Sequence, residues 1–166
     1  PFQILPEASL RLEAPVHLFA TGQNRKIKVS VKNLGPSIEG KLKLETPKSW
    51  ELSPKSISIS IEGKGNEQDF YFNVKAPQQT TIGLLKPSLQ THTKSLSASL
   101  QEISYDHIPK QYLISPAQAK AVALNLKTGV QKVAYIAGAG DNIPESLTAL
   151  GVQVEVLEAK NVTLEK

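Results

Sequence analysis

The glycine-rich run from Gly138 to Asp141 comes closest to a ligand site in its residue types. It lies between an expected strand and an expected helix, where free backbone amides can hold an anion. The dinucleotide-binding fingerprint needs a third small residue three positions after Gly140, and the chain has Ile143 there. Ile143 beside Pro144 fits a hydrophobic staple better than a pyrophosphate seat. Gly138, Gly140 and Asp141 are therefore speculative ligand-binding residues, and no nucleotide cofactor is predicted.

Three aromatic residues could stack on a sugar ring: Trp50, Tyr71 and Tyr112. In a carbohydrate-binding module such rings hold the apolar face of a sugar while neighbouring polar groups bind its hydroxyls. Only 5% of the residues are aromatic, which limits this hypothesis. Trp50 lies beside a turn, and we interpret it first as a packing residue of the core or rim, because aromatic rings usually serve packing.

Catalytic and metal chemistry have little support in this sequence. The chain has no cysteine, which excludes disulfides, thiol nucleophiles, Cys-ligated zinc and iron–sulfur clusters. The run Tyr105-Asp106-His107 holds the only close acid and histidine pair, but a metal site needs three or more convergent ligands. We interpret this run as an interdomain hinge, and His17 and His92 are isolated. No catalytic residue, metal ligand or cofactor is assigned to this chain.

Charge and hydropathy argue against two classes of partner. The 166 residues carry a net charge of +4, but Lys and Arg are scattered with acids between them. Nucleic-acid sites need clustered basic residues with aromatic platforms, so no nucleic-acid partner is expected. No apolar run approaches the roughly 18 residues of a membrane span. The chain begins at Pro1 and has no Met, so a processed start that removes a signal peptide stays open.

Short alternating strands dominate residues 1–108. Apolar residues at every second position predict strands, each ended by turn residues, at 26–32, 40–45, 57–61 and 70–74. Residues 84–93 and 96–103 form a weaker pair around Thr93-Lys94-Ser95. About six or seven short antiparallel strands predict an immunoglobulin- or fibronectin III-like β-sandwich, here an accessory domain spanning residues 1–108. The predicted fold class is mainly β.

The pattern changes after residue 108. Residues 109–131 are expected to be a linker with a connecting strand at 120–127. Residues 132–166 then form a partial α/β (βαβ) unit, whose elements are a strand at 132–136, a helix at 142–150 and a strand at 152–157.

The helix of this unit has clear boundaries in the sequence. Pro144 suits its first turn and Gly151 ends it. One helix covers only one face of a parallel pair of strands, and parallel sheets are normally covered on both faces. We therefore expect the sheet to continue beyond residue 166, and the βαβ unit to lean on the sandwich or on another copy of the chain.

Three runs of residues resemble one known family. They are ISYDHIP at 103–109, PAQAK at 116–120 and VAYIAGAGDNIPESL at 133–147. These runs resemble the region downstream of the catalytic domain in large bacterial deacetylases of the GlcNAc-phosphatidylinositol de-N-acetylase (PIG-L, LmbE-like) family, notably from Bacteroidetes. There a β-sandwich similar to the alpha-galactosidase-associated accessory domain precedes an α/β domain similar to class I glutamine amidotransferases. The resemblance covers most of residues 20–160 and is tightest in 103–151.

The resemblance implies a non-catalytic accessory and linking module of a zinc-dependent N-deacetylase that acts on amino-sugar substrates. The family's zinc-binding Ala-His-Pro-Asp-Asp motif and the cysteine nucleophile of amidotransferases have no counterpart here. Zinc is thus expected in the catalytic domain of the parent protein, which would be the intramolecular partner. The resemblance also favours a periplasmic or extracellular location. Two alternatives stay open: a carbohydrate-binding module, and a structural or assembly domain that uses free sheet edges to bind partners or to self-associate.

Overall fold

The structure, a computed structural model, describes residues 5–105, 107–125, 131–136, 138, 143–149 and 151–158. Its elements in chain order are β1 (Ala8–Leu12), β2 (Val16–Ala20), β3 (Asn24–Asn33), β4 (Ser37–Glu45), β5 (Glu51–Ser53), β6 (Ile57–Glu62), β7 (Glu67–Lys75), β8 (Thr81–Gln90), β9 (Ser95–Leu96), β10 (Ala98–Tyr105), β11 (Ile108–Pro116), β12 (Ala119–Leu124), β13 (Lys132–Ile136), α1 (Ile143–Ala149) and β14 (Gln153–Leu157).

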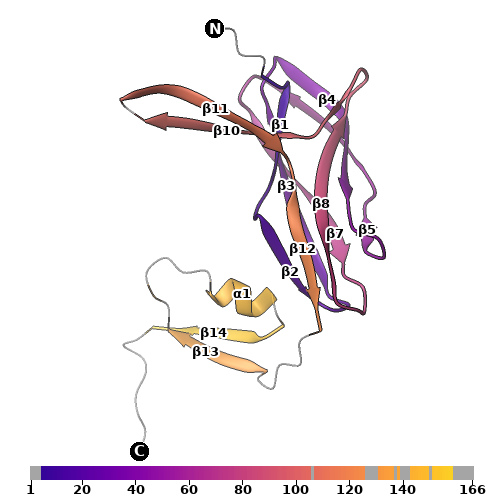
Figure 1. Ribbon diagram of the computed structural model, residues 1–166, viewed down its shortest axis with the longest axis vertical. Helices are drawn as coiled ribbons and strands as arrows, with labels where there is room; N and C mark the ends of the chain where they lie inside the picture. The colour runs from indigo at the N-terminus through magenta and orange to yellow at the C-terminus, as the bar shows by residue number, and fades with distance from the viewer. Residues whose placement is uncertain are drawn as a thin grey trace, which may run out of the picture.

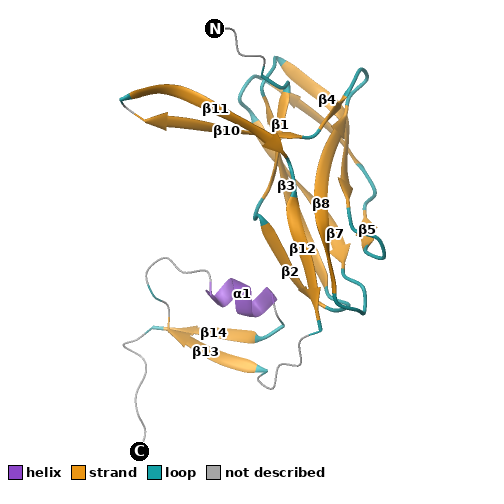
Figure 2. Ribbon diagram, in the orientation of Figure 1, coloured by secondary structure: helices purple, strands orange, loops and turns teal. Residues whose placement is uncertain are grey.

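Two packed sheets form the body of the molecule (Figures 1 and 2). The first sheet has the strand order β1-β3-β7-β5, and the second has the order β2-β12-β8-β4-β6 with β9 paired to β8. The predicted mainly-β, immunoglobulin-like sandwich followed by a βαβ unit is therefore confirmed. No helix among the described residues is long and apolar enough to cross a membrane.

The alternating residues predicted for the strands form the core. In β3, Ile27, Val29 and Val31 are fully buried, because every second side chain of a strand points to the same face. They pack in one core with apolar side chains of both sheets, and the largest fully buried apolar side chains are Phe19, Phe72, Leu10, Ile27, Leu42, Ile61, Leu85 and Leu89. The four strands predicted most clearly are all present, each extended by a few residues at one or both ends.

Asn33 at the end of β3 ties the two sheets together. Its side chain is fully buried, and its amide donates to the carbonyl oxygens of Ile61 and Gly63 at 3.2 and 3.1 Å. Its Oδ1 accepts the Gly35 amide at 3.0 Å. A buried polar side chain is stable only when its groups are paired in this way.

The strand at the end of the expected linker is a member of the sandwich. β12 lies between β2 and β8, parallel to β2 and antiparallel to β8. The sandwich thus extends to Leu124, past the boundary expected at residue 108. The inward positions of β12 are the buried Ala119, Ala121 and Ala123, and alanine gives a weak periodic signal.

β10 and β11 form a two-stranded arm that projects from the sandwich (Figure 1). The expected pairing of residues 84–93 with 96–103 holds only at β9, where Leu89 lies opposite Leu96. From Ala98 onward the chain pairs with β11 instead, in a register that sets Ala98 against Pro116. The interdomain hinge expected at 105–107 is wrong, because Tyr105 and His107 lie at the tip of this arm.

The βαβ unit matches its predicted elements closely. β13 and β14 are parallel, and α1 contacts both β14 and β2, so the unit leans on the sandwich. Gly151 has a φ of 85°; its amide donates to Thr148 O, and the Val152 amide donates to Leu147 O. This pair of bonds is a Schellman motif, which favours glycine at this position.

Candidate functional site

A polar groove lies between the arm and the first sheet. It is an open groove with a volume of about 450 Å³, within the range of ligand-binding clefts, and its lining residues are Ser9, Arg11, Ser30, Lys32, Glu67, Ser99, Leu100, Gln101 and Glu102. The Leu100 amide donates to Ser9 Oγ of β1 at 2.8 Å and ties the arm to the sheet, and the Ala117 amide donates to Ser97 O at 2.8 Å and closes the base of the arm.

Strand register brings the floor of the groove together from distant parts of the chain. Two rows cross β1, β3 and β7: Ser9, Lys32 and Glu67 in one, and Arg11, Ser30 and Asp69 in the next. These are the outward positions of strands whose alternate residues fill the core. The alternation that builds the sandwich therefore also collects the polar side chains of the groove.

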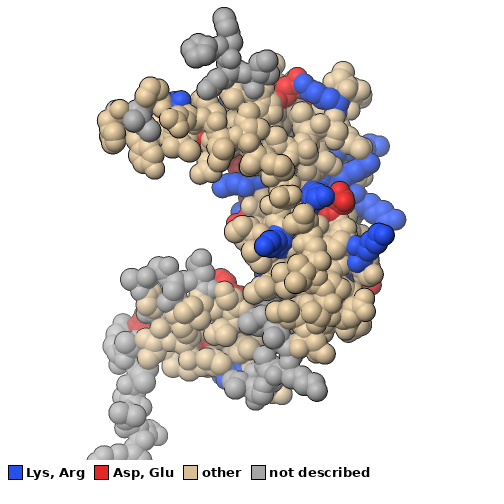
Figure 3. Space-filling view, viewed as in Figure 1, with Lys and Arg blue, Asp and Glu red and all other residues tan. Residues whose placement is uncertain are grey.

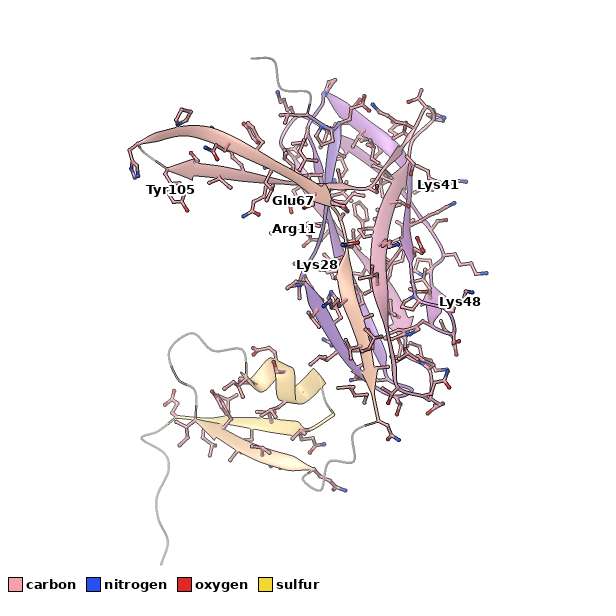
Figure 4. All side chains as sticks on the ribbon, viewed as in Figure 1. Arg11, Lys28, Lys41, Lys48, Glu67 and Tyr105 are labelled. Atoms are coloured by element: carbon pink, nitrogen blue, oxygen red, sulfur yellow. The ribbon has the colours of Figure 1, made fainter. Side chains whose placement is uncertain are left out.

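Charges of opposite sign are paired across the floor. Arg11 Nη2 lies 3.1 Å from Glu67 Oε1, and Lys28 Nζ lies 3.3 Å from Asp69 Oδ2 (Figure 4 labels Arg11, Glu67 and Lys28). Ser30 Oγ donates to Asp69 Oδ1 at 2.6 Å, and this hydrogen bond, with Lys28 and Arg11, lowers the pKa of Asp69. Asp69 therefore stays ionised, as a hydrogen-bond acceptor, at neutral pH.

The arm contributes a further ion pair beside the groove. Lys110 Nζ on β11 donates to Glu102 Oε1 on β10 at 2.7 Å. This hydrogen bond and the charge of Lys110 lower the pKa of Glu102, and Lys32 on the sheet adds to the effect. The groove and the arm beside it thus present charged groups of both signs.

Both faces of the arm also expose large apolar side chains. Tyr105 is 61% exposed, Leu113 52% and Ile114 48%. Leu113 and Ile114 are neighbours in β11, and successive side chains of a strand point to opposite faces. The arm therefore offers apolar contacts in two directions.

The predicted aromatic residues have different environments. Trp50 is only 7% exposed, its Nε1–H donates to Thr81 Oγ1 at 2.9 Å, and its ring meets Phe19 edge-on at 4.8 Å. It is a core residue, so the interpretation of Trp50 as a sugar platform is wrong and the packing interpretation is confirmed. Tyr71 is 45% exposed, on the same outer sheet face as the groove, with the Lys26 ammonium 4.4 Å from the centre of its ring.

The remaining predicted residues do not form a common site. Tyr112 lies half-buried on the arm opposite Glu102, next to the groove but not in its lining. Gly138 is exposed, and Gly140 and Asp141 lie outside the described residues. Among the described residues no three His, Asp or Glu side chains are grouped so as to hold a metal ion.

A second depression lies between β2 and α1. It has a volume of about 500 Å³, and Glu13, Val16, His17, Arg25 and Glu145 are among its lining residues. His17 is 2% exposed, and its Nε2 has no hydrogen-bond partner among the described residues. Burial and the charge of Arg25 lower the pKa of His17 to about 4, so His17 is neutral at pH 7.

The groove and the arm were not predicted from the sequence. The available signal is a pair of runs with aromatic and aliphatic residues, 98–105 and 108–116, on either side of Asp106-His107, which is compatible with a hairpin. Pro109 and Pro116 obscure it, because proline counts against a strand. Both prolines are tolerated here because a two-stranded ribbon has a free edge on each strand.

Comparison with known proteins adds little beyond the fold. No protein-family model and no curated protein matches the chain. Solved structures with a similar β-rich arrangement include the native conformation of E. coli alpha-2-macroglobulin, with 16% identity and a TM-score of 0.47 over 72% of this chain and 7% of that one. A family 123 glycoside hydrolase from Clostridium perfringens gives 10% identity and a TM-score of 0.40 over 87% of this chain and 32% of that one. Neither is described as a deacetylase, and the chain spans less than a third of either length.

Proposed function

We propose that this chain is a non-catalytic accessory and linking module of a larger protein, and that the β10–β11 arm is its contact with the neighbouring domain. The observation that carries the proposal is the arm itself. It leaves the sandwich as a two-stranded ribbon with Tyr105, Leu113 and Ile114 exposed on its two faces. Isolated ribbons are marginally stable in water, and exposed apolar patches on them mark contact surfaces.

The groove below the arm supports the same function. Its charges are already paired within the chain, Arg11 with Glu67 and Glu102 with Lys110. Preorganised polar groups add specificity and register, while apolar anchors such as Leu113 provide affinity. A polypeptide partner that covers the arm and reaches into the groove would satisfy both kinds of surface.

The parent that we propose is a zinc-dependent N-deacetylase acting on amino-sugar substrates. Support comes from the resemblance of residues 103–109, 116–120 and 133–147 to the region downstream of the PIG-L catalytic domain. In that arrangement catalysis and zinc belong to another domain of the same polypeptide. No step of the chemistry involves a residue of this chain.

The arm can be tested by removing it cleanly. Ala98 and Pro116 lie opposite each other at its base, so two glycines can join them as a hairpin turn in place of residues 99–115. We expect the thermal unfolding of this variant to stay near that of the intact chain. Its affinity in trans for the separately purified remainder of the parent protein, measured by titration calorimetry, should fall more than about tenfold. Equal binding without the arm would contradict the proposal.

A second measurement tests the parent. The natural protein, captured with an antibody to this chain, is expected to have an intact mass far above 18.0 kDa and about one zinc per chain. A zinc-free protein near 18.0 kDa would remove the deacetylase assignment. The arm experiment would then be repeated with proteins that co-purify with the chain.

Carbohydrate binding is a second candidate, favoured by the exposed ring of Tyr71 beside the polar groove. Titration of labelled chain with amino-sugar oligosaccharides, followed by NMR, should then shift resonances of the groove strands. Tyr71→Ala should abolish those shifts and Lys48→Ala should not. The loss of binding in both variants, or in neither, would count against this candidate.

A further inference from the structure

The outer face of the second sheet carries a largely apolar patch, interrupted by the exposed Lys120 on β12. Strand register places Val16, Lys120 and Leu84 in one row, and Leu18, Val122 and Ile82 in the next, across the neighbouring strands β2, β12 and β8. Leu124 follows on β12. This apolar face is defined here by Val16, Leu18, Ile82, Leu84, Val122 and Leu124.

The apolar face is open to solvent. Ile82 is 72% exposed, Val16 44% and Leu84 37%, while Leu18, Val122 and Leu124 are half-buried. A single exposed aliphatic residue is ordinary on a protein surface, but six aliphatic residues grouped on three adjoining strands are typical of a contact surface. Farther across the same sheet, β4 and β6 show the usual polar outer face, with Lys41, Ser58 and Ser60 exposed.

Lysines border the apolar face on the side of β4. Lys41, Lys43, Lys48 and Lys86 lie there, with Glu39 and Glu45 as the acids between them, and none of the four lysines forms an ion pair within the described part of the chain. Figure 3 shows blue side chains gathered on this side of the molecule, and Lys41 and Lys48 point outward there in Figure 4.

Acids border the apolar face on the side of β2. Glu13 and Glu145 line the depression beside Val16 and Leu18, and neither forms an ion pair in the described ranges. Arg25, in the same depression, is already engaged: it donates to Leu18 O and lies over the Phe19 ring. The two borders are therefore opposite in charge, with apolar rows between them.

We propose that two copies of this chain associate face to face through the apolar face. Charge complementarity with a second copy is the reason for this choice of partner. A two-fold axis in the interface, parallel to the strands, turns the β4 side of one copy over the β2 side of the other. Lysines of each copy then face acids of its partner, twice by symmetry.

Lys48 and Glu145 lie at similar positions along the strand direction, as this contact requires. Pro47, next to Lys48, packs against Gly83 on the core face of β8, at the level of Ile82 and Leu84 along the strand, whereas Glu145 shares its depression with Val16 and Leu18. Measured along the strands, both charges are therefore near the two apolar rows. The proposed contact goes beyond the accessory function, and it leaves the arm free because the groove lies on the other sheet.

The oligomeric state of the intact chain tests the proposal. Sedimentation equilibrium should show a dimer that dissociates on dilution, and Ile82→Lys should raise the dissociation constant at least about tenfold. Ile82 is so exposed that this change should leave thermal unfolding nearly unaltered. The matched control is Leu113→Lys on the arm, which should leave the dimer intact. A monomer of 18.0 kDa at all concentrations, or a dimer lost only with Leu113→Lys, would overturn the proposal.

Charge reversal gives a second, independent readout. Lys48→Glu and Glu145→Lys should each weaken the dimer several-fold at low salt, because each places like charges opposite one another. The two changes combined in one chain should restore the dimer, since the pair is only exchanged. A combined variant that dimerises more weakly than either single variant would refute the face-to-face arrangement.

Discussion

Trp50 fills the core with its ring and satisfies its one polar group at Thr81. Replacement by Ala would open a large cavity, so we expect Trp50→Ala to lower the free energy of unfolding by about 3–5 kcal/mol. Urea titration followed by circular dichroism measures this. Tyr71→Ala, at a site 45% exposed, should cost less than about 1 kcal/mol. Similar losses for both variants would show that Trp50 is not buried.

His17 makes stability depend on pH in one direction. Its pKa is about 4 in the folded chain and 6.5 in an unstructured peptide, so the unfolded chain binds more protons between these values. Stability contributed by neutral His17 is therefore complete above pH 6.5 and is lost as the pH falls toward 4, by up to about 3 kcal/mol.

Variants of His17 and of His92 separate the effect of His17 on the pH dependence of stability from the effect of carboxylates that titrate in the same range. His17→Gln should flatten the fall in unfolding free energy between pH 6.5 and 4, and His92→Gln, at an exposed position, should not. Urea titrations at several pH values measure the difference. A parallel pH profile for wild type and His17→Gln would show that burial does not displace the titration of His17.

At the scale of single residues, sequence reasoning identified the environment of some candidates and not others. Packing was correctly preferred for Trp50 because a lone tryptophan beside apolar strands usually fills a core. The groove residues Arg11, Lys32 and Glu67 looked like ordinary surface charges, since nothing local shows that strand register brings them together. A binding surface built from long-range pairing leaves no spacing motif.

Gly40 shows how closely β4 and β8 approach each other. A Cβ at Gly40 would lie 2.4 Å from the carbonyl oxygen of Gln90, on the backbone of the neighbouring strand. We expect Gly40→Ala to lower the unfolding free energy by about 1–3 kcal/mol, because backbone must move to admit the methyl group. Gly35→Ala is the control: its nearest contact would be Asn33 Oδ1 at 3.8 Å, and thermal unfolding should change little.

Elements with strong periodicity were predictable and elements without it were not. β3, β6 and β7 alternate bulky apolar with polar residues, so their existence and faces follow from the sequence. α1 was predictable from Pro144 and Gly151 at its ends. β12 presents only alanines to the core, and β11 contains two prolines, so neither gave enough signal to reveal its true partner.

β12 joins β2 to the rest of the second sheet, so we expect the stability of the sandwich to depend on it. A chain of residues 1–125 keeps β12 between β2 and β8, and we expect it to unfold cooperatively with a dispersed NMR spectrum. A chain of residues 1–108 leaves β2 without its partner strand and uncovers one edge of β8. It should be aggregation-prone or partly unfolded. A well-folded 1–108 chain would mean that β12 is dispensable.

The position of β12 also sets an order of events during synthesis. β2 is made early but pairs only with β12, and roughly 100 residues separate Ala20 from Ala119. At ribosomal rates of about 5–20 residues per second, β2 waits roughly 5–20 seconds for its partner. During that interval the nascent chain exposes the edge and the apolar side chains of β2, and after residue 90 has been made it also exposes one edge of β8. A chaperone that binds extended apolar segments would bind this polypeptide on the ribosome. It would be released when β12 has been made and the side chains of Ala119, Ala121 and Ala123 complete the core.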